Sequence, residues 1–91
     1  MQVHVELYGI PRQRARAEHA RVELDAATAS LGDVLESLAV RFPELAAACF
    51  DGRRLKSGYV ANVDGKQFLR DPEARLSDGD CLLILSADAG G

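Results

Sequence analysis

The feature that most constrains how this chain folds is a stripe of apolar side chains between residues 31 and 42. Its members recur at spacings of three and four residues: Leu31, Val34, Leu35, Leu38, Ala39 and Phe42. In an α-helix this spacing places all of them on one side. Ser30 is expected to cap the helix by accepting a hydrogen bond from the amide of Asp33. Pro43 lacks an amide hydrogen, so the helix should end near residue 42 with one apolar face to be covered.

The residues before this helix predict a hairpin of two strands. Residues 2–8 alternate strictly between apolar and polar side chains, which is typical of a half-buried strand. Gly9-Ile10-Pro11 interrupts the pattern, and the charged residues 12–18 are expected to form a loop. Alternation resumes over residues 20–24, so the second strand should return beside the first.

The residues after the helix predict a second hairpin. Residues 44–49 are expected to add one short helical piece, followed by a polar surface connection over residues 51–58. The β-prone segments 59–63 and 66–69 flank Asp64-Gly65, a pair that favours a tight turn in which both residues take positive φ.

A last strand is predicted over residues 81–85, which are apolar on both faces, as expected of a central strand covered on both sides. One helix on one face of a mixed sheet would bury both apolar surfaces, so the fold class is α+β. Residues 1–86 are expected to form this domain. Residues 87–91 are small, lack periodicity and are expected to form a flexible tail.

Size and composition exclude several classes of protein. The chain has 91 residues, room for one domain, and a net charge of −3, which argues against binding to nucleic acid. No apolar run approaches the roughly 20 residues that span a bilayer, so no membrane association is expected. Cys49 and Cys81 lack the spacing of a metal site and are expected to be free thiols. A cytoplasmic location and no bound metal follow as expectations.

The order of elements, together with two motifs, resembles the β-grasp sulfur carriers of the MoaD and ThiS type. The first motif is Leu76-Ser77-Asp78-Gly79-Asp80, followed by one apolar strand and a short tail that stops at Gly90-Gly91. The second, Val63-Asp64-Gly65-Lys66, looks like the family's Val-Asn-Gly-Glu hairpin. Ser86-Ala87 stands where family tails often carry a Pro-Pro pair. The resemblance implies a ubiquitin-like β-grasp fold, with a mixed four- to five-stranded sheet, one main helix on one face and a flexible C-terminal tail.

The resemblance also implies a carrier that works through its own tail. An E1-like adenylating enzyme would use ATP and magnesium to convert the carboxylate of Gly91 to an acyl-adenylate, and a sulfurtransferase persulfide would then leave sulfur there as a thiocarboxylate. A sulfur-accepting synthase subunit would receive it, with molybdopterin the leading product. Gly90 and Gly91 have no Cβ, so their backbone can pass through a narrow channel. The carrier itself would bind no cofactor.

A carrier must also dock on its partners. By the family's strand register Leu82 and Ile84 point inward, so Leu83 and Leu85 would form an exposed apolar patch with Phe68, unless a loop covers them. Asp88 and Ala89 would belong to the same partner-binding region.

Three aspartates are expected to add negative charge near the tail and to steer it to a basic groove: Asp78, Asp80 and Asp88. They could equally be turn residues and solubilising charge, and for Asp78 the turn role is favoured.

No intrinsic active site is visible in the sequence. His4 and His19 occupy polar positions of separate strand segments, where a solvated histidine is the favoured interpretation. We therefore expect a carrier and not an enzyme. One form that such a carrier can take is the small subunit of a complex such as molybdopterin synthase. Three functions remain open: sulfur donation, with thiamine thiazole, cysteine or another thio-metabolite as alternative products; conjugation of Gly91 to lysines of other proteins, as in a ubiquitin-like modifier; and a bare interaction module with an inert tail.

Overall fold

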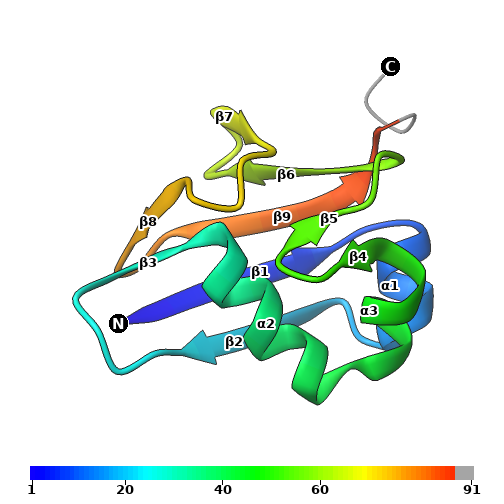
Figure 1. The fold of residues 1–91 in the computed structure, drawn as a ribbon, viewed down its shortest axis with the longest axis horizontal. Coiled ribbons are helices and arrows are strands. Elements are labelled where there is room, and N and C mark those ends of the chain that lie inside the picture. Colours follow the sequence, from blue (N-terminus) through cyan, green and yellow to red (C-terminus); the bar gives the residue numbers. More distant parts are fainter. Residues whose placement is uncertain (88–91) are drawn as a thin grey trace.

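In the computed structural model, which describes residues 1–87, a five-stranded mixed sheet forms the body of the protein (Figure 1). The strand order is β2-β1-β9-β6-β7. The strands are β1 (Gln2–Leu7), β2 (His19–Glu23), β6 (Tyr59–Val63), β7 (Gln67–Leu69) and β9 (Cys81–Ser86). β9 pairs with β1 in parallel and with β6 antiparallel, so the last strand lies at the centre, as its two apolar faces predict. The two predicted hairpins, β1-β2 and β6-β7, are confirmed.

One face of the sheet is covered by α2 (Leu31–Arg41), the helix that the apolar stripe predicts (Figure 1). A capping box begins it: Asp33 N donates to Ser30 Oγ and Ser30 N donates to Asp33 Oδ2, both at 3.1 Å. The helix ends before Pro43, as expected.

The core lies between α2 and the inward face of the sheet. Val5, Leu82 and Ile84 have no exposed surface and pack in one cluster with the stripe residues Leu35 and Leu38. Because side chains alternate along a strand, the residues between them point to the other face, which α2 does not cover. The predicted inward orientation of Leu82 and Ile84 is therefore correct.

The segment between β1 and β2 differs from the prediction of a loop. Ile10–Ala15 form a short helix, α1, with Pro11 in its first turn and Arg16 closing it in the left-handed conformation at φ 58°. Pro11 is its buried residue. A helix of six residues that buries one side chain shows no apolar stripe, so periodicity could not reveal it.

Short elements complete the chain. The predicted helical piece after α2 is present as α3 (Pro43–Cys49). The structure also contains two small antiparallel pairs that the sequence did not predict, one formed by β3 (Thr28–Ser30) and β8 (Arg75–Ser77), the other by β4 (Phe50–Asp51) and β5 (Arg54–Leu55). Within residues 1–87, none of the helices has the length and apolar character needed to cross a membrane.

Candidate functional site

The tail leaves the protein from the central strand of the sheet. β9 ends at Ser86, which lies opposite Tyr59 of β6, and the next amide, Ala87 N, donates to Gly58 O at 2.9 Å. The predicted site residues beyond this point lie outside the described residues: Asp88, Ala89, Gly90 and Gly91. Their roles therefore stay predictions, and the described part of the site is the region from which they depart.

The outer face of the sheet, the face opposite α2, brings the three predicted docking residues together. Phe68 of β7 lies opposite Asn62 of β6, and Asn62 lies opposite Leu83 of β9, which forms a row across three strands. Leu85 lies opposite Val60 in the next row. Phe68 is 64% exposed, and both leucines are half-buried. We call these five side chains the outer patch.

Sequence reasoning missed Val60 and Asn62 as members of the outer patch. The alternation within Tyr59–Val63 carried the signal, because Ala61 is fully buried in the core and its two neighbours must face the other way. Asn62 is only 7% exposed, although it lies on the face without a helix. Its Oδ1 atom is buried and has no hydrogen-bond partner.

Beside the outer patch, the carboxylate of Glu6 on β1 accepts hydrogen bonds from two side chains of the same chain, a thiol and a phenol. Cys81 Sγ donates to Glu6 Oε2 at 2.9 Å and Tyr8 Oη donates to Glu6 Oε1 at 2.7 Å. These two hydrogen bonds hold the pKa of Glu6 below its usual value. Burial, and then Glu6 itself, raises the pKa of Cys81 to about 11. At neutral pH Cys81 is therefore a protonated thiol and a weak nucleophile.

The remaining thiol and the histidines add no reactive centre. Cys49 is buried at the end of α3 and burial raises its pKa, and both cysteines are free thiols, as predicted. His4 and His19 lie on neighbouring strands with ring centroids 5.6 Å apart, both exposed on the outer face. Among residues 1–87, no three His, Cys, Asp or Glu side chains are grouped so that they could hold a metal ion.

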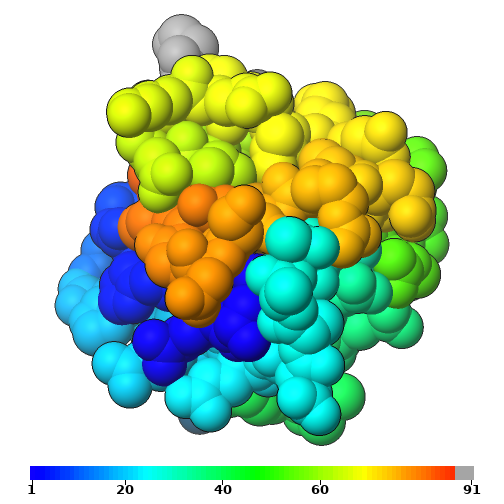
Figure 2. All heavy atoms as spheres, turned by 90° about the vertical axis from the view of Figure 1, so that its left-hand side faces the viewer, coloured from blue at the N-terminus to red at the C-terminus, as the bar shows by residue number. Residues whose placement is uncertain are grey.

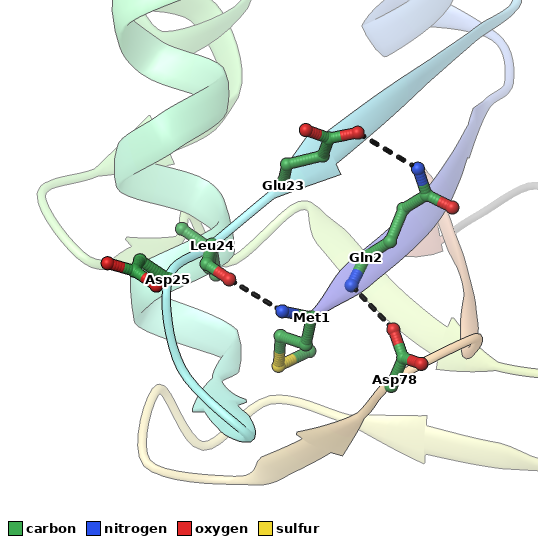
Figure 3. A pocket seen from close by; sticks show the side chains of 6 residues that line it. All are labelled: Met1, Gln2, Glu23, Leu24, Asp25 and Asp78. Atoms are coloured by element: carbon green, nitrogen blue, oxygen red, sulfur yellow. Dashed lines mark hydrogen bonds between the residues drawn. The ribbon is translucent and has the colours of Figure 1, made fainter.

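The motif Asp78-Gly79-Asp80 ties the start of β9 to the start of β1 (Figure 2). Gln2 N donates to Asp78 Oδ1 and Gly79 N donates to Gln2 O, both at 2.8 Å. Ser77 N donates to Asp80 Oδ2 at 2.8 Å, which closes the turn, and Gly79 takes a φ of 88° that favours glycine. Figure 3 shows Asp78 reaching Gln2 at the rim of a shallow hollow beside the amino group of Met1. The motif therefore sets the parallel register of β1 and β9.

Contrary to the expectation, Asp78 and Asp80 do not lie at the point from which the tail departs. They precede β9, whose six residues separate them from Ala87 by roughly 20 Å. Three basic side chains, Arg54, Lys56 and Arg70, lie near the tail exit instead. They line a hollow of about 300 Å³ together with Asp51, Leu55 and Ser57, next to the Gly58 carbonyl that binds Ala87. The sequence hid this cluster because the connection between residues 69 and 75 folds back beside residues 54–57, where Arg70 Nη2 donates to Ser57 O.

Solved structures share this fold. SAMP1 from Haloferax volcanii has a TM-score of 0.83, is 23% identical and covers 100% of both chains. The putative molybdopterin converting factor, subunit 1, from Pyrococcus furiosus has a TM-score of 0.76 at 20% identity, over 94% of this chain and 97% of that one. A chain of the Amycolatopsis orientalis BexX/CysO complex has a TM-score of 0.72 at 26% identity, over 98% and 99% of the two chains. The predicted α+β, β-grasp fold of the ubiquitin-like type is confirmed.

Comparison of the sequence with protein families gives one identification. No protein with a curated description matches the chain. The model of the ThiS family matches residues 5–91, which takes in the second half of β1 and all later strands of the sheet, the Asp78-Gly79-Asp80 turn and the Gly-Gly end. The resemblance to the MoaD and ThiS type carriers is therefore correct, and the chain belongs to the ThiS family.

Proposed function

We propose that this ThiS-family protein is a sulfur carrier that donates sulfur in molybdopterin biosynthesis from a thiocarboxylate on Gly91. The single observation that carries the proposal is the family match, which extends through Gly90 and Gly91. The position of β9 supports it, because a central strand held by β1 and β6 gives the tail a fixed point of departure. Two free thiols agree with a cytoplasmic site of action.

The chemistry requires activation by another protein. A carboxylate is a poor electrophile, so an E1-like adenylating enzyme would use ATP and magnesium to form an acyl-adenylate on Gly91 and release pyrophosphate. The terminal sulfur of a sulfurtransferase persulfide would displace AMP and give an acyl disulfide. A thiol would cleave that bond, leaving sulfur on the Gly91 carbonyl carbon and becoming oxidised to a disulfide. The carrier needs no catalytic group of its own. The two described thiols agree with this, because their raised pKa values make them weak nucleophiles at neutral pH.

The outer patch is the surface that we assign to docking. Phe68, Leu83 and Leu85 lie on the face that α2 leaves open, and β9 carries two of them to within a few residues of the tail. An apolar patch beside a reactive tail would hold each partner in turn, the adenylating enzyme first and the sulfur-accepting synthase subunit later. Asp88 and Ala89 would complete the contact. The neighbour solved as a BexX/CysO complex is a precedent for a partner bound to a chain of this fold.

The test is intact-mass analysis of the protein incubated with ATP, magnesium, a sulfur source and the adenylating enzyme of its native host. We expect exchange of one oxygen for sulfur, confined to the C-terminal peptide. Molybdopterin formation from its sulfur-free precursor, with the host synthase subunit, then tests the pathway, and thiazole and cysteine synthesis are assayed in parallel. An unmodified carboxylate under all of these conditions would refute sulfur transfer.

A second candidate function is conjugation to other proteins. The observation that favours it is the likeness to a structure described as small archaeal modifier protein 1 from H. volcanii, with a TM-score of 0.76. Digestion of host proteins and mass spectrometry would detect Gly-Gly remnants on lysines if this function operates. Remnants without sulfur exchange would favour the modifier over the carrier.

Gly91 variants separate activation from folding. Deletion of Gly91, or addition of one residue after it, should abolish acyl-adenylate formation, because the activated carbonyl carbon is moved in the partner's active site. The thermal unfolding midpoint should not change, since the core lies within residues 1–87. The matched control, Ala87→Gly, should still be converted to the acyl-adenylate by the adenylating enzyme. Activation of the deletion variant at the wild-type rate would contradict the role of Gly91.

A further inference from the structure

β2 lies at one edge of the five-stranded sheet, so one side of its backbone has no strand beside it (Figure 1). Leu7 N donates to Glu18 O at 2.8 Å just before β2 begins, and the bonds of an antiparallel ladder recur at every second residue. Ala20 and Val22 therefore bond to β1 as well. The alternate residues turn their amides and carbonyls to the open edge: His19, Arg21 and Glu23. Such unpaired groups are a template for another strand.

One of these outward groups is already bound by a side chain. Arg41, the last residue of α2, donates from Nη1 to Arg21 O, the central carbonyl of the edge. The guanidinium carbon lies 5.3 Å from the centre of the Phe42 ring, a cation–π contact that helps to hold it there. A donor on an edge carbonyl lies where the amide of a neighbouring strand would lie. Within residues 1–87, the other outward amides and carbonyls of β2 bind no group of the protein.

We propose that Arg41 is a guard residue, which keeps β2 from pairing with β2 of a second copy of this chain. The blocked pairing is antiparallel and two-fold symmetric about Arg21. Its two central hydrogen bonds would join the Arg21 amide of each copy to the Arg21 carbonyl of the other. Because Arg41 binds that carbonyl in both copies, these two bonds do not form while it is in place. The guard role is independent of the proposed sulfur transfer.

The side chains of β2 make a second copy the partner that fits this edge. In the two-fold register, the imidazole of His19 lies opposite the carboxylate of Glu23 in the other copy, a favourable polar pair on the outer face. On the inner face Ala20 lies opposite Val22, so the contact there is apolar. Only the two Arg21 side chains oppose each other as like charges, which weakens a sheet. Arg21 is therefore a second obstacle to pairing, and a test of Arg41 must remove its charge too.

The experiment compares self-association in a background from which the Arg21 charge has been removed. Sedimentation equilibrium measures the dimer dissociation constant of Arg21→Thr, alone and combined with Arg41→Met, which keeps an apolar stem and loses the donor. The constant should be about ten- to a hundredfold lower for the combination, because two hydrogen bonds across the two-fold axis are restored. Arg21→Thr combined with Arg14→Met is the matched control. Arg14 is exposed on α1, so this control has the same charge and the same new surface methionine.

Hydrogen exchange followed by NMR locates the contact. The amide at position 21 should exchange freely in the control and become protected as the Arg41→Met combination dimerises. Equal dissociation constants for the two combinations overturn the guard role, and so does a dimer in which position 21 stays unprotected. If Arg41→Met does not fold, Arg41→Gln, whose shorter side chain also lacks the guanidinium, takes its place with the same criteria. Protection of position 21 that appears only when the host adenylating enzyme is added would make the occupant a partner's strand, and would also overturn the inference.

Discussion

At the scale of single residues, the burial of Cys81 and its hydrogen bond to Glu6 together decide the chemistry of the outer face. Both a carboxylate and a thiol could have been reactive groups at this place. Instead, Glu6 accepts from Cys81 Sγ and Tyr8 Oη, which lowers its own pKa and raises that of both donors. The thiol stays protonated near neutral pH, so Cys81 is a weak nucleophile on this face.

Glu6→Gln should make Cys81 more reactive. Its pKa of about 11, compared with 9.0 for an ordinary thiol, lowers the thiolate fraction at pH 8 roughly a hundredfold. The substitution removes the charge of Glu6 but leaves the burial of the thiol, so alkylation at pH 8 should accelerate severalfold and only part of the shift should disappear. Mass spectrometry of the Cys81 peptide gives the rate separately from that of Cys49. Glu23→Gln, on β2, is the control and should leave it unchanged.

The same pair makes stability depend on pH in a defined direction. The pKa of Cys81 is higher in the folded protein than in the unfolded chain. Its contribution to the free energy of unfolding is therefore complete below about pH 9 and is lost as the pH rises toward about 11. The folded pKa of Glu6 lies below its unfolded value, so its contribution is present above that value and is lost on acidification. Glu6→Gln should therefore make the free energy of unfolding less dependent on pH, on both the acid and the alkaline side.

At the scale of elements, the first turn of α2 is the junction that joins the helix to the rest of the chain. Leu31 N donates to Ala74 O and Gly32 N donates to Pro72 O, both at 2.8 Å, so the loop before β8 satisfies two of the free amides of the helix start. Arg53 Nη2 donates to Ser30 Oγ at 3.1 Å, and its guanidinium also forms an ion pair with Asp33. The backbone amide of Ser30, and then Arg53, lowers the pKa of Asp33.

Ser30→Ala should destabilise the protein by about 1 kcal/mol, because the amide of Asp33 loses the buried hydroxyl that accepts from it. The change is measured as a lower midpoint of urea unfolding with an unchanged slope. Ser57→Ala, on an exposed loop, should leave the midpoint unaltered. Equal midpoints for the two variants would mean that the capping box contributes nothing measurable.

At the scale of the whole molecule, charge is distributed unevenly between the two ends of β9. Asp78 and Asp80 lie where the strand begins, whereas Lys56 and Arg70 lie where it ends and the tail departs. The net charge of −3 hides this local positive cluster. A partner that receives the tail is therefore expected to be acidic where it meets the tail exit.

Charge reversal at the tail exit should slow association without unfolding the protein. The double variant Lys56→Glu, Arg70→Glu should bind the host adenylating enzyme with an association rate about tenfold lower at low salt, and the difference should shrink as salt is added. Stopped-flow measurements give the rate. Arg75→Glu, on β8 at the far end of β9, is the matched control and should have a smaller effect. Faster association of the double variant would indicate a basic groove.

The sequence by itself determined the elements that have a long repeating pattern. The stripe from Leu31 to Phe42 predicted α2, and the two apolar faces of residues 81–85 predicted the central position of β9, because burial imposes a period on every residue of a long element. The Asp64-Gly65 pair predicted its turn, and both residues have positive φ, 57° and 72°. These features depend on residues that are close together in the chain, so they can be predicted from the local sequence.

Only the tertiary structure decided the features that depend on residues far apart. β3 and β8 are three residues long and pair across 45 or more positions, which leaves no local pattern to read. Local sequence also could not predict the basic cluster at the tail exit or the hydrogen bond between Cys81 and Glu6. Nor could it predict the unpaired oxygen of Asn62 between Phe68 and Leu83. Register across a sheet is fixed by the joint burial of its strands together with the turns that join them, and the register determines which side chains become neighbours on the outer face.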